Sequence, residues 1–320
     1  MNTLRRERML IIGASPRGGN HLLRALLDDH PELVLPPDED YFLRTLLRKP
    51  LYRTLALLTS PERSPAVYRR LQKRGHLERV NAGRAKNSFG TEGVLDLDRY
   101  YEYVRTHHRR FSIEGMIRTH FGAMESALGL DPAGTAESAR VRVAFCALQS
   151  DKGDTINIGR VLSSMYELRG VFVLRDPRSH FASKLGRKSD ASLRRFCRRQ
   201  NDFWRQIDQF EDRFGPALRV RFEDLVTNTE ATMRRVCDFS GITFSESCVR
   251  PTQSGEATVS NSSFGTVHGV DQGVLTRYRD EVPPETIRYL ESNCRPELFW
   301  TRSDAELPPV EPAVVAGAAT

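Results

Sequence analysis

Residues 9–24 of this chain read MLIIGASPRGGNHLLR, which is an apolar run, a turn rich in glycine and then a helical pattern. The apolar run predicts a buried strand, and the glycines allow a tight turn whose backbone N–H groups face inward. A helix beginning near Asn20 adds the positive end of its dipole, and Arg17 adds a guanidinium. The stretch therefore predicts a binding site for a phosphate-like group. It is not a Walker A loop, because no Gly-Lys-Ser/Thr follows the turn.

A second segment, VFVLRDPRSHFAS at 171–183, repeats this arrangement. A β-branched and aromatic strand ends at Arg175, and Asp176-Pro177 then opens a helix that carries Ser183. Asp is a preferred N-cap, and Pro fits the first helical position, where its missing N–H costs nothing. Arg175 and Ser183 are therefore candidates to hold a second phosphate.

Together the two segments resemble the sulfotransferases that use 3'-phosphoadenosine 5'-phosphosulfate (PAPS). In that family a strand-loop-helix of the form Pro-Arg/Lys-Ser/Gly-Gly-Thr binds the 5'-phosphosulfate, and Arg-Asp/Asn-Pro followed by a serine binds the 3'-phosphate. VRFEDL at 220–225 and DKGD at 151–154 also agree with family segments in order and spacing. The resemblance implies that PAPS, as co-substrate, is bound by Ser15, Pro16, Arg17, Gly18, Gly19, Asn20, His21, Arg175 and Ser183.

The sequence departs from the family at three places, one of which is DKGD at 151–154, where the Pro of the family's Lys-Thr-Pro is absent. Asn20 stands where Thr or Ser is usual, although its amide can still hydrogen-bond a phosphate oxygen. The late Arg-Lys-Gly triplet, which holds the 3'-phosphate in the cytosolic members, is missing, and NSSFG at 261–265 occupies the corresponding loop.

The resemblance also implies the catalytic groups. The sulfuryl group of PAPS is already activated, so the protein must align a hydroxyl, remove its proton and stabilise developing charge, and no metal is required. Arg17 and Lys152 are the cations expected at the phosphosulfate oxygens. The cytosolic members' base, a His after the third strand, is absent here, whereas Glu39 matches the base of the heparan-type members. Partial burial beside Tyr41 and Phe42 is expected to raise the pKa of Glu39.

Each of these catalytic assignments has an alternative. The acidic cluster around Glu39 also fits a cap for the following helix, and Lys152 also fits a surface loop. Other candidate bases are Asp38, Asp40, His21, His107, His108 and His120.

Short apolar runs near 9–13, 32–35, 141–148, 170–174 and 217–222 predict five strands with helices between them. This alternation predicts an α/β fold with a parallel sheet and helices on both faces, as the resemblance to P-loop-like sulfotransferases also implies. Ligands in such sheets bind beyond the carboxyl ends of the strands. We expect one domain over 1–302 and a disordered tail over 303–320.

Positive charge is concentrated in one segment. The chain carries a net charge of +7, and residues 44–86 hold twelve Lys or Arg against two Glu. Prolines divide this segment into short helical patterns, so we expect a basic helical insertion. It is either a set of solvated helix faces or a segment that attracts an anionic acceptor or an acidic surface. No recognised nucleic-acid-binding module accompanies the charge.

The remaining signals concern the compartment. No apolar run has the length of a membrane span, and residues 9–12 are too short for a secretory signal. The five cysteines are scattered and lack metal spacing, which is typical of reduced thiols. We therefore expect a cytoplasmic protein, and we make no prediction of its oligomeric state.

The sequence thus predicts an enzyme that moves a sulfuryl group from PAPS to a hydroxyl of a carbohydrate, a lipid or a small metabolite by in-line displacement. Two other classes stay open. A P-loop kinase of small molecules would share the sheet and the turn but should show Gly-Lys-Ser/Thr and a metal-binding carboxylate. A non-catalytic nucleotide- or polyanion-binding protein would keep the anion sites and lack the base.

Overall fold

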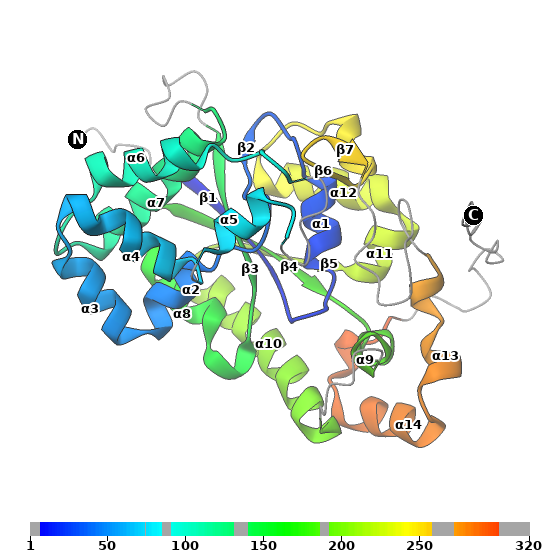
Figure 1. The fold of residues 1–320 in the computed structure, drawn as a ribbon. Helices are drawn as coiled ribbons and strands as arrows, with labels where there is room; N and C mark the ends of the chain where they lie inside the picture. Colours follow the sequence, from blue (N-terminus) through cyan, green and yellow to red (C-terminus); the bar gives the residue numbers. More distant parts are fainter. Residues whose placement is uncertain are drawn as a thin grey trace, which may run out of the picture.

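The computed structural model describes residues 7–73, 75–84, 91–130, 140–185, 192–257 and 272–300. Within them, the central element is a five-stranded parallel sheet in the order β2-β3-β1-β4-β5 (Figure 1). The strands are β1 Arg8–Ala14, β2 Leu33–Val34, β3 Val141–Ala147, β4 Glu167–Leu174 and β5 Ala217–Arg221. Each overlaps one of the five predicted runs, so the predicted sheet is confirmed. The expected tail and the late loop at 261–265 lie outside the described residues.

Helices connect the strands. They are α1 Asn20–Leu26, α2 Phe42–Arg48, α3 Pro50–Leu58, α4 Ser64–Leu71, α5 His76–Asn81, α6 Leu97–His107, α7 Ile113–Ala127, α8 Asp154–Leu162, α9 Pro177–Leu185, α10 Leu193–Arg213, α11 Phe222–Thr227, α12 Thr229–Ser240, α13 Tyr278–Glu281 and α14 Pro284–Asn293. A short antiparallel pair, β6 Thr252–Gln253 and β7 Glu256–Ala257, was not predicted. In the described part of the chain, no helix combines the length and apolar character of a membrane span.

Alternate residues of the central strand face two separate cores. Ile11 packs in a core built with α2, α4, α6, α7, α8, α9 and α10. Ile12 packs in a second core built with α1, α11 and α12. A strand buried on both faces explains why residues 9–12 are continuously apolar rather than alternating. Helices on both faces of a parallel sheet are therefore confirmed.

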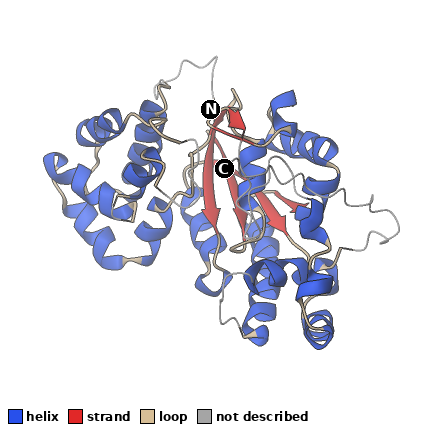
Figure 2. Ribbon diagram, turned by 45° about the vertical axis from the view of Figure 1, so that its right-hand side comes forward, coloured by secondary structure: helices blue, strands red, loops and turns tan. Residues whose placement is uncertain are grey.

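The basic segment forms helices, as predicted. It spans α2 to α5, and Pro50 and Pro65 lie in the first turns of α3 and α4. With α6 and α7, these helices make a helical group beside the sheet (Figure 2). Whether residues 1–302 fold as one domain stays a prediction.

A buried polar network anchors this helical group to the sheet. Asp40, between β2 and α2, accepts hydrogen bonds from the Phe42 N–H at 2.8 Å and from Gln72 Nε2 at 3.3 Å. His120 of α7 donates from Nε2 to Asp40 at 3.0 Å, and its Nδ1 lies 2.8 Å from the Tyr100 hydroxyl. Burial raises the pKa of Asp40, but the charge and hydrogen bond of His120, together with the hydrogen bonds from Phe42 and Gln72, bring the pKa below its ordinary value.

Asp40→Asn should therefore lower the free energy of unfolding by about 1–3 kcal/mol, because the amide cannot keep the charge-assisted bond to His120 in a buried site. Urea unfolding followed by circular dichroism measures the loss. Asp98→Asn, at an exposed position of α6, is the matched control and should change stability little. Equal effects of the two substitutions would contradict an anchoring role for Asp40.

Candidate active site

The turn between β1 and α1 has the tight geometry predicted for an anion-binding loop. The Gly18 N–H donates to the Ser15 carbonyl at 2.7 Å. Gly19 has a φ of 103°, and a Cβ there would lie 2.3 Å from Cδ2 of Phe222. Only glycine fits this position, because both the backbone and the space exclude a side chain. Arg17 also adopts a positive φ of 73°, which non-glycine residues rarely do.

The two predicted anion-binding segments meet at one end of the sheet (Figure 1). Arg17 donates from Nη2 to Ser183 Oγ at 3.3 Å. Arg175 Nη1 lies 3.5 Å from the Arg17 carbonyl. His180 of α9 donates from Nε2 to the carbonyl of Pro16 at 2.9 Å, and burial holds the pKa of His180 well below its ordinary value. The turn and α9 are thus directly linked.

Arg175 is a buried cation. Its side chain bonds Ser179 Oγ from Nε at 3.0 Å and stacks 4.3 Å above the Phe222 ring. Burial lowers the pKa of Arg175 to about 10; Glu223 opposes this shift, and the charges of Arg17 and Arg277 add to it. Arginines from three distant parts of the chain therefore repel one another here, and a bound anion would relieve that repulsion.

Arg277 was not predicted from the sequence. It lies between the 3-10 turn Gln272–Leu275 and α13, far along the chain from Arg17 and Arg175. No family triplet marks it, so only the fold brings it near Arg175.

Asn20 leaves a buried donor without a partner. It begins α1, it is 2% exposed, and its Nδ2 has no hydrogen-bond acceptor among the described residues. A buried amide group usually has a partner, so an oxygen of a bound anion is a natural one at this helix N-terminus. The observation fits the prediction that Asn20 replaces the family's Thr or Ser.

Glu39 lies beside His21, which follows the turn. Glu39 Oε1 is 3.4 Å from His21 Nε2, and Glu39 Oε2 is 3.8 Å from Arg44 Nη1. Burial raises the pKa of Glu39, but the hydrogen bonds from His21 and Tyr41 and the charges of His21 and Arg44 bring it below its ordinary value. The expectation of a raised pKa was therefore wrong.

The error came from the surroundings assumed for Glu39. Phe42 does not shield the carboxylate, because its ring stacks on His120 at 4.2 Å. The donors that stabilise the charged form belong to α1, α2 and the loop before α2, which the local sequence does not bring together.

Lys152 is exposed at the end of the 3-10 turn Ser150–Lys152, and its catalytic role stays a prediction. The second acidic residue of the same DKGD segment is Asp154. Asp154 is buried and accepts from Arg48 Nε at 2.7 Å and from the Gln149 N–H at 2.9 Å. This segment therefore joins α2 to the carboxyl end of β3.

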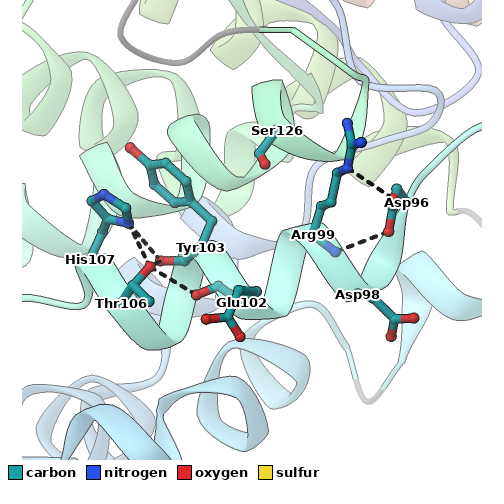
Figure 3. Close-up of a pocket in the computed structure, with 8 residues that line it drawn as sticks. All are labelled: Asp96, Asp98, Arg99, Glu102, Tyr103, Thr106, His107 and Ser126. Carbon is teal, nitrogen blue, oxygen red and sulfur yellow. Dashed lines mark hydrogen bonds and ion pairs between the residues drawn. The ribbon is translucent and has the colours of Figure 1, made fainter.

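Most other candidate bases are engaged elsewhere. Asp40 and His120 bind each other, and Asp38 accepts from the Glu39 N–H at 2.7 Å. His108 is buried, with Nε2 3.2 Å from the Thr59 carbonyl. Figure 3 shows His107 in a surface pocket on α6 and α7, stacked on Tyr103, and no predicted site residue apart from His107 lines that pocket. Of these candidates, His21 is the one paired with Glu39.

Besides Glu39, the site contains a second carboxyl group, Glu223, which the sequence analysis missed. It lies in the first turn of α11, is 1% exposed, and accepts from the Asp176 N–H at 2.9 Å. Burial and the neighbouring charge of Asp176 raise the pKa of Glu223 to about 7, and Arg175 opposes them. The carboxyl group next to Arg175 thus titrates near neutral pH.

Comparison with known proteins supports the predicted family. Residues 155–246 match the model of the sulfotransferase family. The sulfotransferase domain of the Synechococcus PCC 7002 olefin synthase is 16% identical with a TM-score of 0.53, over 91% of this chain and 96% of that domain. The sulfotransferase domain from the curacin biosynthetic pathway is 15% identical with a TM-score of 0.50, over 90% and 97%. At these identities the likeness concerns the fold. No match is found among curated protein sequences.

The raised pKa of Glu223 gives a pH-dependent prediction. The folded value of about 7 lies above the ordinary glutamate value of about 4.3. The stability that this group contributes is therefore fully present below the unfolded pKa and is lost as pH rises through the folded pKa. Glu223→Gln stays neutral, so its stability relative to wild type should rise by roughly 2 kcal/mol between pH 5 and pH 8.

Urea unfolding at the two pH values measures this difference. Glu281→Gln, at an exposed position of α13, is the control and should track wild type at both pH values. A difference between Glu223→Gln and wild type that does not change with pH would show that Glu223 is ionised throughout this range.

Proposed function

Because the family match and the shared fold support assignment of this chain to the sulfotransferase family, we propose that it transfers the sulfuryl group of PAPS to a hydroxyl acceptor. One observation carries the proposal: two anion-binding segments, far apart in sequence, meet through the Arg17–Ser183 hydrogen bond of 3.3 Å. PAPS carries a 5'-phosphosulfate and a 3'-phosphate, and it therefore requires two neighbouring anion sites.

We assign the 5'-phosphosulfate to the turn and the start of α1. Suitable donors are the Arg17 guanidinium, the unpartnered Asn20 amide and the turn N–H groups other than that of Gly18, which bonds the Ser15 carbonyl. We assign the 3'-phosphate to Arg175 and Ser183, with Arg277 in place of the missing Arg-Lys-Gly triplet. Lys152 completes the proposal as a cation for the phosphosulfate oxygens.

In the proposed reaction, the acceptor oxygen forms a bond to sulfur while the bond from sulfur to the bridging phosphate oxygen breaks. The hydroxyl proton passes to the Glu39 carboxylate, and adenosine 3',5'-bisphosphate leaves. The lowered pKa of Glu39 keeps it ionised at neutral pH, which is the form a base requires. His21, 3.4 Å away, positions that carboxylate.

The alternatives make different chemical demands. A small-molecule kinase would use the Gly-Lys-Ser/Thr element that this turn lacks, and it would transfer phosphate rather than sulfate. A binding protein would hold the bisphosphate without turnover. A cytoplasmic location and contact of residues 44–86 with an acidic surface also remain our predictions.

Binding of the product tests the two phosphate assignments. Calorimetry should detect adenosine 3',5'-bisphosphate without added metal, and Arg175→Ala should weaken it about 10- to 100-fold, since a charge-assisted hydrogen bond contributes roughly 1.5–3 kcal/mol. Adenosine 5'-phosphate should lose little affinity. Arg205→Ala, at an exposed position of α10 where the guanidinium pairs with Asp202, is the control.

Two results would count against this assignment. A folded wild-type protein that takes up no bisphosphate would refute PAPS as the donor. Equal losses for both nucleotides in Arg175→Ala would place Arg175 at the 5' site or in the support of the fold.

Sulfate transfer from labelled PAPS tests the base. Glu39→Gln keeps the shape of the side chain and removes the proton acceptor, so turnover should fall about 10²- to 10⁴-fold while bisphosphate affinity stays within a few-fold. His21→Gln should lose less. The reverse order of losses would identify His21 as the base and Glu39 as its positioning residue.

A further inference from the structure

Two cations of the basic insertion, Lys73 and Arg44, lie over the ring of Tyr41, which is beside Glu39. Lys73 Nζ is 3.2 Å from the centre of the Tyr41 ring, and Arg44 Cζ is 5.6 Å from the same centre. Tyr41 in turn hydrogen-bonds Glu39. The side of the site that faces the proposed base is therefore positively charged, and the charge comes from α2 and from the segment after α4.

Lys73 is exposed, and its ammonium group has no ion pair among the described residues. Its neighbour Gln72 bonds the buried Asp40, and Lys73 itself adopts a positive φ of 51°. Among the described residues, no carboxylate oxygen lies within 4.0 Å of the ammonium group, which contacts the Tyr41 ring instead. An anionic group bound beside the Tyr41 ring would pair with this ammonium group.

Arg44 is buried and incompletely satisfied. Its side chain is 9% exposed, and its nearest carboxylates, Glu39 at 3.8 Å and Asp154 at 3.6 Å, lie beyond hydrogen-bond distance. Its Nε has no hydrogen-bond partner among the described residues. Asp154 is already bonded by Arg48 and by the Gln149 N–H. A buried guanidinium in this state gains from an added anion.

We propose that the acceptor is an anionic hydroxyl compound and that Lys73 and Arg44 bind its carboxylate, phosphate or sulfate group while Glu39 faces its hydroxyl. This inference rests on the proposed function. The two cations are needed because an anionic acceptor must approach a donor that itself carries several negative charges, and like charges at close range repel strongly where water is partly excluded. A neutral acceptor would place no anion beside Lys73 and would leave Arg44 with only its long ion pairs to Glu39 and Asp154.

The proposal explains why some cations of the basic segment point inward instead of into solvent. Arg44 and Arg48 stand one helical turn apart on α2 and both face Asp154, whereas most other cations of the segment are exposed. The segment is therefore more than a solvated surface, because part of its charge is built into the wall of the site.

Matched pairs of hydroxyl compounds test the inference on the protein saturated with adenosine 3',5'-bisphosphate. The pairs are 4-hydroxybenzoate with 4-hydroxybenzamide, and glycerol 3-phosphate with glycerol, so that carboxylate and phosphate are examined separately. Calorimetry should find the anionic member of at least one pair bound tenfold or more tightly. Lys73→Gln should abolish this preference, and Lys73→Arg should restore it.

Arg70→Gln, at an exposed position of α4, is the control and should keep the preference. Equal binding of charged and neutral members, a preference that survives in Lys73→Gln, or a bisphosphate complex that takes up none of the four compounds would overturn the inference. Failure to bind the bisphosphate itself would instead refute the proposed function, so the two failures are distinguishable.

Discussion

The closeness of Arg17 and Arg175 is the constraint on which the rest of the site depends. The guanidinium of Arg17 reaches Ser183, while Arg175 reaches back to the Arg17 carbonyl. Parallel strands make this possible, since β1 and β4 are neighbours and release their following loops at the same edge. The fold offsets part of the repulsion with Glu223 and Asp176 and leaves the remainder for a ligand.

Local sequence predicted the parts of the site that depend on local structure. Each strand is an apolar run, each anion-binding loop follows its own strand, and Asp176 caps α9 by accepting the Arg178 N–H at 2.8 Å. Each of these features depends only on residues that are neighbours in the sequence. The sequence also predicted that ligands bind beyond the carboxyl ends of the parallel strands, but it did not predict the hydrogen bond between Arg17 and Ser183.

Features that depend on distant contacts were not predicted. The pKa of Glu39 is set by His21 and Arg44, which come from different helices, and therefore the expected upward shift was wrong. His180 belongs to the second predicted segment, but its hydrogen bond to the Pro16 carbonyl forms only when the turn is folded. Arg277 could not be predicted from the sequence, because no anion-binding motif surrounds it.

Two neighbours of the Phe222 ring, Gly19 and Arg175, place opposite demands on the size of the side chain at 222. The ring occupies the space that any side chain at position 19 would need, and it provides the surface beneath the Arg175 guanidinium. A smaller residue at 222 would clear the space beside position 19, where the positive φ would still strain alanine, and it would remove the platform under the arginine. The three positions are therefore physically coupled through this one ring.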